Sequence, residues 1–379
     1  MIEKGRFAVL HNPRDVKIEE MAIKQPAPDQ ALIRIMACGV CPTDVRSYTG
    51  LRGGGYPRTL GHEWVGEIIE TGKDFFGFNV GDRVSADWRV VCGKCYYCRR
   101  GIFNYCQKTQ NERVSGGFCE YGVSIASNLR TIPDSVSFEE ATFTEPLACC
   151  INGSRNTNIS MGDDVVIIGS GPIGMLHIQL AKHYGARVIV SDPIDGRLEV
   201  AKELGADNTI NPTKEDVTKQ VMDMTEGRGA NSVVVAVGTP EAAKLGIDIA
   251  GICGTVNFFA GTYPPGEIAL DPNVVHYKQL ILIGSHDFTP HDFTTALKLI
   301  EYGIVKVKPI ISHVIPLDDI TTAFETVADR KGLKVVVKMD SNTQKGTARS
   351  ILKHCGKWAG NDAEEIIKLI EETRAEAEF

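Results

Sequence analysis

A strand that runs directly into a glycine-rich turn and then a helix is the feature that most constrains the fold of this chain. The apolar run Val165 to Ile168 is followed by Gly169-Ser-Gly171-Pro-Ile-Gly174, where a helical pattern begins. Gly169 permits a tight turn, Gly171 lets the backbone approach a pyrophosphate, and Gly174 allows close packing of the helix on the strand. The helix N-terminus offers amide donors to the phosphates. The motif predicts a dinucleotide-binding site.

Asp192 strengthens this prediction and indicates which dinucleotide is bound. It ends the next predicted strand, 18 residues beyond Gly174. A carboxylate there can accept hydrogen bonds from both ribose hydroxyls and would repel a 2′-phosphate, so NAD is favoured over NADP. Arg197 lies nearby in the sequence. It either weakens the preference for NAD over NADP or is an ordinary surface residue of the following helix. The remaining candidate cofactor contacts are Pro172, Ile173 and Val237.

The region around this motif alternates short apolar strands with helical segments. We expect strands at 165–168, 187–190, 232–237, 255–259 and 280–283, and helices at 172–184, 197–204 and 241–249. Strands that are apolar on both faces and joined by helical crossovers predict a doubly wound parallel sheet.

The length of 379 residues suits two domains better than one. From Phe7 to about Thr144, short alternating apolar stretches broken by glycine predict an all-β domain with irregular loops. A helix near 293–302 and a strand at 334–338 suggest a return to that domain. We expect domains at 1–150, completed by 286–340, and at 151–285, with a helical extension at 341–379.

Four cysteines share one loop: Cys92, Cys95 and Cys98, then Cys106 after seven further residues. Four thiolates suit tetrahedral zinc or an iron–sulfur cluster. The last spacing and the following Gln107 differ from the bacterial ferredoxin pattern, so zinc is preferred. A site closed by four cysteines has no open position for a substrate, and we interpret it as structural.

Composition excludes several classes of function. The net charge of −7 disfavours nucleic acid as a partner, and no apolar run approaches the roughly 18 residues that cross a bilayer. The first residues lack the apolar core of a secretory signal, and the cysteines suggest metal ligation more than disulfides. We therefore expect a cytoplasmic protein without nucleic-acid or membrane partners.

A second set of candidate metal ligands lies in the first domain. The segments are Cys41-Pro-Thr43-Asp44, Gly61-His62-Glu63 with Gly66, and Thr144-Glu145-Pro-Leu147. Each residue alone has a structural explanation, such as a core cysteine, a buried histidine or a surface glutamate. Together, thiolate, imidazole and carboxylate are what an open catalytic zinc site needs.

With these motifs, the sequence resembles the zinc-containing medium-chain dehydrogenases, in the branch of the sorbitol and threonine dehydrogenases. The resemblance runs from near the N-terminus to about Met339. It implies a GroES-like catalytic domain joined to a Rossmann domain, with the active site in the cleft between them. It also implies a catalytic zinc besides the structural one and a homodimer or homotetramer, and NAD remains the cofactor that Asp192 favours.

The resemblance assigns roles to individual residues. Cys41, His62 and Glu63 match the ligands of the catalytic zinc, and Glu145 matches a carboxylate that binds the metal or its water. Asp44 resembles the carboxylate that orients the zinc histidine, and Thr43 is placed to hydrogen-bond the reacting oxygen. Cys38 lies three residues before the ligand position and is interpreted as a core thiol. Arg46 departs from the histidine often found in relatives, and arginine cannot accept a proton.

The expected activity is hydride transfer from a secondary alcohol to NAD, since a Lewis acid beside a hydride acceptor suits that reaction. The carboxylates Glu63 and Glu145 favour a hydroxyl-rich substrate, a polyol or sugar alcohol. Two alternatives remain open. One is a threonine 3-dehydrogenase-like enzyme, and the other is a nicotinamide-binding zinc protein without catalytic activity.

Overall fold

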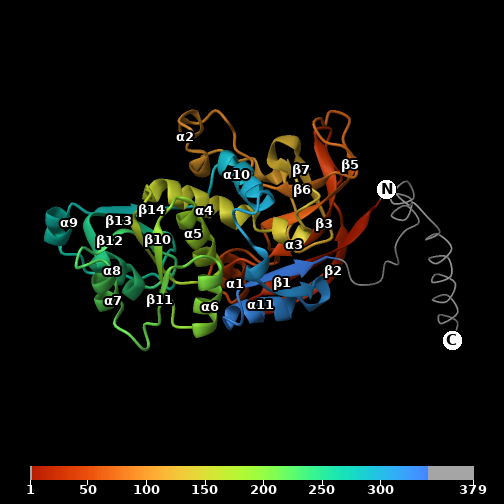
Figure 1. Cartoon of the computed structure of the whole chain (residues 1–379). Helices are drawn as coiled ribbons and strands as arrows, with labels where there is room; N and C mark the ends of the chain where they lie inside the picture. Colours follow the sequence, from red (N-terminus) through yellow and green to blue (C-terminus); the bar gives the residue numbers. More distant parts are fainter. Residues whose placement is uncertain (1, 340–379) are drawn as a thin grey trace, which may run out of the picture. The chain divides into compact units, whose positions relative to one another are not determined.

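The computed structural model describes residues 2–339, which lie in one compact unit (Figure 1). The helical extension expected at 341–379 lies outside the described residues. Within the described part, no helix has the length and apolar character required to span a bilayer.

A six-stranded sheet carries the glycine-rich turn. Its order is β11-β10-β9-β12-β13-β14, and every neighbouring pair is parallel. The strands are β9 Asp164–Ile168, β10 Arg187–Ser191, β11 Asn208–Ile210, β12 Ala230–Val235, β13 Ala250–Phe258 and β14 Ile281–Gly284. The strand order reverses direction at β9 and β12, and ligands of such sheets bind at the carboxyl ends beside this reversal.

Helices connect these strands, as expected for a doubly wound sheet. They are α5 Pro172–His183, α6 Asp195–Glu203, α7 Val217–Met224, α8 Pro240–Ile249 and α9 Pro272–Lys278. The predicted elements are confirmed with small shifts in their ends. β12 ends at Val235, so Val237 lies in the following turn instead of the strand. β11, α7 and α9 were not predicted, and each is short, with three, eight and seven residues.

A second, largely antiparallel sheet holds the candidate metal ligands. Its order is β15-β16-β3-β5-β6-β8, with β7 paired to β3. The strands are β3 Gln30–Gly39, β5 Glu63–Thr71, β6 Arg83–Ala86, β7 Tyr121–Ile125, β8 Leu129–Thr131, β15 Ile311–Pro316 and β16 Lys334–Lys338. β16, which follows the parallel sheet in the sequence, pairs with β3 of this second sheet.

A small three-stranded sheet lies in the same region, in the order β2-β1-β4. Its strands are β1 Lys4–Asn12, β2 Asp15–Ala22 and β4 Arg58–Thr59. Six helices come before or after the parallel sheet in the sequence. They are α1 Pro42–Tyr48, α2 Tyr96–Arg99, α3 Phe138–Ala141, α4 Thr144–Thr157, α10 Pro290–Glu301 and α11 Ile320–Ala328. Short 3₁₀ turns occupy 103–105, 111–113, 126–128, 308–310 and 317–319.

The expectation of an all-β first region was therefore wrong in detail. Pro42 stands in the first turn of α1, and the Asp44 side chain accepts a hydrogen bond from the backbone N–H of Cys41 at 3.1 Å. Both features favour a helix start. Farther along, α4 follows at Thr144–Thr157.

The largest core joins the two sheets. Phe143 and Leu147, at the start of α4, are buried with Val65 of β5 and with Val165 of β9. Helix α4 also packs against α5 and α10. The helix that carries Glu145 is thus held by contacts with both sheets.

Candidate active site

Three candidate ligands converge at the N-terminal end of α1. Cys41 precedes α1, whereas His62 and Glu63 lie where the chain enters β5. One ligand atom from each lies within 4.8 Å of the others. Soft thiolate, imidazole and carboxylate donors so close together fit a zinc ion with an open position.

Asp44 contacts one member of this cluster, His62. Its Oδ1 lies 3.5 Å from Nδ1 of His62 and also accepts a hydrogen bond from the Gly61 N–H at 3.2 Å. Burial lowers the pKa of His62, but the charges of Asp44 and Cys41 outweigh burial and raise it well above the usual value. Burial alone would raise the pKa of Asp44, but the charge of His62 and its hydrogen bond outweigh burial and lower the pKa of Asp44. Asp44 therefore fixes the orientation of the imidazole.

Lys334 is a site residue that sequence reasoning missed. Its Nζ forms an ion pair with Glu63 Oε2, and both side chains are buried. A Cβ at Gly39 would overlap Glu63 Oε2 and crowd Lys334, so glycine at that position leaves room for the pair. No sequence signal indicated this contact. Lys334 is the first residue of an apolar strand, and it reaches Glu63 only because β16 pairs with β3.

Glu145 faces the same region from α4. It is 8% exposed, and a carboxylate oxygen of Glu145 lies within 4.8 Å of ligand atoms of Cys149 and Asp287. Burial raises the pKa of Glu145 to about 7, while His62 lowers it and Glu63 raises it. The charges of His62 and Glu63 thus act on the pKa of Glu145, which places its carboxyl group near their cluster with Cys41. Cys149 lies one helical turn after Glu145, a spacing that would have indicated the contact had α4 been predicted.

Arg89 and Trp88 close another side of this region. Asp287 forms an ion pair with Arg89, which also donates a hydrogen bond to the Asn104 carbonyl at 2.9 Å. The Trp88 ring lies edge-on to His62, with ring centroids 6.4 Å apart. Arg89 and Asp287 thus pair with each other, whereas the buried Nε1 of Trp88 has no hydrogen-bond partner in the described part of the chain.

The other assigned side chains occupy distinct positions. Cys38 is fully buried in β3, and burial raises the pKa of its thiol well above the usual value, which suits a core thiol. Thr43 lies in the first turn of α1, and its carbonyl accepts a hydrogen bond from Ser47 at 3.2 Å. Arg46 follows one turn later.

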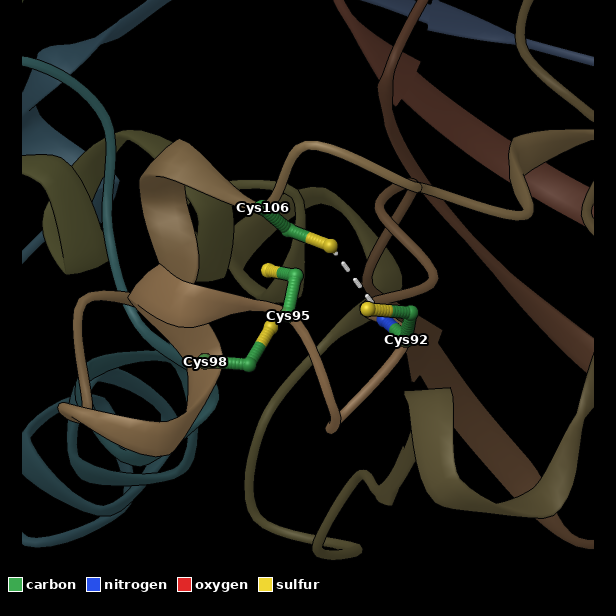
Figure 2. Close-up of side chains that lie close together, drawn as sticks. All are labelled: Cys92, Cys95, Cys98 and Cys106. Carbon is green, nitrogen blue, oxygen red and sulfur yellow. Dashed lines mark hydrogen bonds between the residues drawn. The ribbon is translucent and has the colours of Figure 1, made fainter.

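The four loop cysteines also converge. Figure 2 shows Cys92, Cys95, Cys98 and Cys106 directed toward one another, and their sulfurs lie within 4.8 Å of one another. The Cys92 N–H donates to the Cys106 sulfur at 3.3 Å. Backbone N–H groups of Cys98 and Gln107 lower the pKa of Cys95 to about 6. The donor set and the stabilised thiolate fit a tetrahedral zinc ion.

The glycine-rich turn has the geometry a dinucleotide needs. Gly169 has a φ of +96°, and a Cβ at Gly174 would overlap the Gly169 carbonyl oxygen. A Cβ at Gly171 would meet nothing nearer than Arg197 Nη1 at 4.0 Å, so the backbone there is open to approach. Pro172 and Ile173 open helix α5 directly after the turn.

Asp192 lies beside this turn. Its Oδ2 accepts a hydrogen bond from the Ser170 N–H at 2.8 Å, and its Oδ1 accepts one from the Ile194 N–H at 2.9 Å. Arg197 donates to the carbonyl oxygens of Gly332 at 3.0 Å and Arg330 at 3.3 Å. Its guanidinium is therefore directed to the 330–332 turn and does not pair with Asp192.

Family models match the two halves of the described region. The alcohol dehydrogenase GroES-like domain model matches residues 27–134, and the zinc-binding dehydrogenase model matches residues 172–302. These matches agree with the fold expected from the sequence: a GroES-like region and a Rossmann-type parallel sheet.

Similar proteins cover nearly the same length. The chain is 38% identical to an L-threonine 3-dehydrogenase of Pyrococcus horikoshii over 330 residues, and this aligned segment covers 84% of this chain and 94% of the relative. It is 34% identical over 338 residues to a sorbitol dehydrogenase of Halalkalibacterium halodurans, which covers 88% and 96%. A Sinorhizobium meliloti structure determined with bound NADP matches with a TM-score of 0.83 at 29% identity, covering 89% of this chain and 99% of that one. The chain therefore belongs to the zinc-containing medium-chain dehydrogenase/reductase family, in the branch of the polyol and threonine dehydrogenases.

Proposed function

We propose that this zinc-type dehydrogenase oxidises a secondary hydroxyl of a polyol or sugar alcohol with NAD as the hydride acceptor. The observation that carries the proposal is the convergence of Cys41, His62 and Glu63, whose ligand atoms lie within 4.8 Å of one another. These three residues would hold the catalytic zinc, with Glu145 beside the metal or its water. Cys92, Cys95, Cys98 and Cys106 would hold the structural zinc.

The bound groups supply Lewis-acid activation of the hydroxyl and a hydride acceptor. The side chains of this chain handle the proton. Thr43 Oγ1 would hydrogen-bond the reacting oxygen and pass its proton on. Arg46 cannot accept that proton, because a guanidinium is effectively always protonated. Glu145 can, because burial raises its pKa to about 7. The proton would leave through Glu145, the cofactor ribose or water.

Selection of NAD over NADP rests on Asp192. Two backbone N–H groups hold its carboxylate at the end of β10, and the side chain is only 4% exposed. A fixed negative charge beside the ribose would repel a 2′-phosphate. The engagement of Arg197 with the 330–332 carbonyl groups supports the same preference, because that guanidinium does not neutralise Asp192.

A polyol is favoured by the acceptors around the cluster. Glu63 and Glu145 bring two carboxyl groups to the cluster, and carboxylate oxygens accept hydrogen bonds from neighbouring hydroxyls. L-threonine is a second candidate substrate, favoured by the 38% identity to a threonine 3-dehydrogenase. Its charged ammonium and carboxylate would need partners of both signs.

We also propose that the enzyme is a cytoplasmic homo-oligomer. β14 pairs only with β13 among the described strands, and Ile281 in it is 54% exposed. Apolar groups on a free sheet edge favour pairing with a second copy. The cytoplasm is supported by thiols that serve better as metal ligands than as disulfides.

One assay series tests the function. Sugar alcohols, inositols, short diols and threonine are supplied with NAD or NADP, and reduced cofactor is measured. We expect turnover of a polyol with NAD, and turnover of threonine alone would replace the polyol assignment. Metal analysis separates an enzyme from a non-catalytic relative, since two zinc ions per chain support the enzyme and one supports a binding protein.

A further inference from the structure

The segment between the two parts of the candidate zinc site is strongly basic. Residues 45–61 contain Arg46, Arg52 and Arg58 and have no aspartate or glutamate, although the whole chain has a net charge of −7. Cys41 precedes the segment closely, and His62 follows it directly. Positive charge concentrated beside an active site attracts anions.

Arg46 presents an unpaired guanidinium from α1, the helix that begins directly after Cys41. It lies on α1, one turn after Thr43, and its Cζ is 4.0 Å from the centroid of the Tyr263 ring. Within residues 2–339 its guanidinium has no hydrogen bond or ion pair. Stacking on Tyr263 fixes the plane of the group and leaves its N–H edges available. Such an edge matches two oxygens of a phosphate.

Arg58 is a second guanidinium without a partner. Its Nε and Nη2 are buried, and neither has a hydrogen-bond partner in the described part of the chain. Its Nη1 lies against Gly54, where a Cβ would overlap it, and Gly54 is part of an exposed glycine run. Burying an unpaired charge is costly. An anion bound beside this glycine run would pair with the Arg58 guanidinium, which the protein leaves unpaired.

Tyr56 connects the loop that carries Arg58 to the helix that carries Arg46. The Tyr56 hydroxyl donates to the Ser47 carbonyl at 3.2 Å, which ties the loop to α1 next to Arg46. Arg58 Cζ lies 5.6 Å from the centroid of the same Tyr56 ring. Tyr56 therefore links Arg58, which lies over its ring, to the backbone of α1 at the residue after Arg46.

Nearby described carboxylates are already engaged. Asp44 accepts hydrogen bonds from the N–H groups of Cys41 and Gly61 and pairs with His62. Glu325, on α11 behind α1, accepts from Arg14 and from the Tyr48 hydroxyl. Neither contacts Arg46 or Arg58, so the positive charge at this surface is not neutralised within residues 2–339.

We propose that Arg46 and Arg58 bind the phosphate group of a phosphorylated sugar alcohol, which deepens and rests on the function proposed above. The phosphate would be held at the 45–61 segment while a hydroxyl farther along the carbon chain reaches the Cys41, His62 and Glu63 cluster. The reaction is otherwise unchanged. The alcohol loses a hydride to NAD⁺ and a proton to solvent, giving a carbonyl compound, NADH and H⁺.

The test compares matched pairs of sugar alcohols and their terminal phosphates on the zinc-loaded enzyme. We expect the phosphorylated member to have a kcat/KM roughly 100-fold higher, as two charge-assisted contacts allow. Arg58→Gln and Arg46→Gln should each lower kcat/KM for the phosphate roughly 10- to 100-fold, chiefly through KM. Inorganic phosphate should inhibit the wild-type enzyme competitively and bind measurably by calorimetry, and Arg58→Gln should weaken both effects.

Arg52→Gln is the matched control. Arg52 is exposed on the same loop, so its loss removes the same charge without removing a proposed contact. If Arg52→Gln weakens phosphate binding as much as Arg58→Gln, general attraction explains the effect and the site is refuted. A fall in NAD affinity instead would assign the oxyanion to the cofactor and overturn the substrate claim.

Two further outcomes separate this inference from the proposed function. Good turnover of neutral polyols without preference for their phosphates would overturn only the phosphate site. Failure to oxidise any alcohol would overturn the function, and phosphate calorimetry would still test the site directly. Arg46→Lys guards against a folding defect, because it keeps the charge but loses the planar fork, and it should retain the melting temperature while binding phosphate less tightly.

Discussion

Lys334 and Glu63 form a buried ion pair although they lie 271 positions apart in the sequence. The pair joins the start of β16 to the start of β5, directly beside His62. Glu63 is therefore both a candidate zinc ligand and the partner of a buried cation. This double role makes Lys334 a test of how the site is assembled.

Lys334→Met should destabilise the metal-free protein strongly. Removing one member of a buried pair leaves the other charge uncompensated, which typically costs about 3–5 kcal/mol. Zinc would recover part of this loss by neutralising Glu63. Denaturant unfolding with and without zinc measures both effects, and Lys334→Arg serves as the control that keeps the charge. Equal stability of Lys334→Met and the wild type without metal would contradict the pairing.

Glu145 predicts a pH dependence of stability in the metal-free protein. Burial raises its pKa from the ordinary value of 4.5 to about 7, so the folded state holds the proton more tightly than the unfolded state. Between these two values the unfolded chain has already lost the proton, and the contribution of Glu145 falls as pH rises. The slope approaches about 1.4 kcal/mol per pH unit.

The comparison with Glu145→Gln isolates this contribution from other titrating groups. The variant cannot titrate at this position, so the stability gap between it and the wild type should change across the same pH window. Denaturant midpoints measured from pH 4 to pH 8 provide the test. A gap that stays constant with pH would show that the carboxyl keeps an ordinary pKa.

Cys95→Ser should remove one zinc ion per chain and loosen the loop between 92 and 106. Backbone N–H groups lower the pKa of Cys95 to about 6, so this thiol is readily available as a thiolate ligand. A closed four-cysteine site stabilises its loop by metal binding. Metal analysis and limited proteolysis measure the two effects. Cys253→Ser is the control, because Cys253 is exposed and outside the cluster. Unchanged zinc content in Cys95→Ser would refute the assignment.

Local motifs were predictable from the sequence, and long-range contacts were not. The Gly169–Gly174 turn and the Cys92–Cys106 loop each lie within a short segment, so spacing alone restricts their geometry. Lys334 reaches Glu63 only through the pairing of β16 with β3, which no local pattern reveals. Asp287 likewise reaches Glu145 from a turn where its φ is +62°.

Helix α4 shows a different limit. Its segment contains Gly153, Thr157 and two adjacent cysteines, all of which have weak helix propensity. Its stability comes instead from burial between α5, α10 and the two sheets. Tertiary packing thus overrode local preference, and without the helix the contact between Glu145 and Cys149 could not be predicted.

Thr43→Val should lower turnover while both zinc ions remain bound. Valine keeps the shape of threonine but cannot pass a proton, and loss of a positioned proton-transfer group typically costs about 10²- to 10⁴-fold. Within residues 2–339 the Thr43 hydroxyl has no hydrogen bond of its own, so its loss should spare the fold. Thr43→Ser should retain most activity. Near-normal turnover of Thr43→Val with full metal content would refute the role.

Ile281→Lys should weaken self-association without changing the fold of one subunit. Ile281 lies on β14, whose second edge has no partner among the described strands, and Ile252 on the neighbouring strand is 74% exposed. A charge on this edge would oppose pairing with the same edge of another copy. Light scattering should show a smaller assembly at equal concentration. Met161→Lys is the matched control, because Met161 is 86% exposed outside the β14 edge. If both variants keep the wild-type mass, the β14 edge is not the contact between subunits, since a buried lysine there would leave its charge unpaired and could not be tolerated.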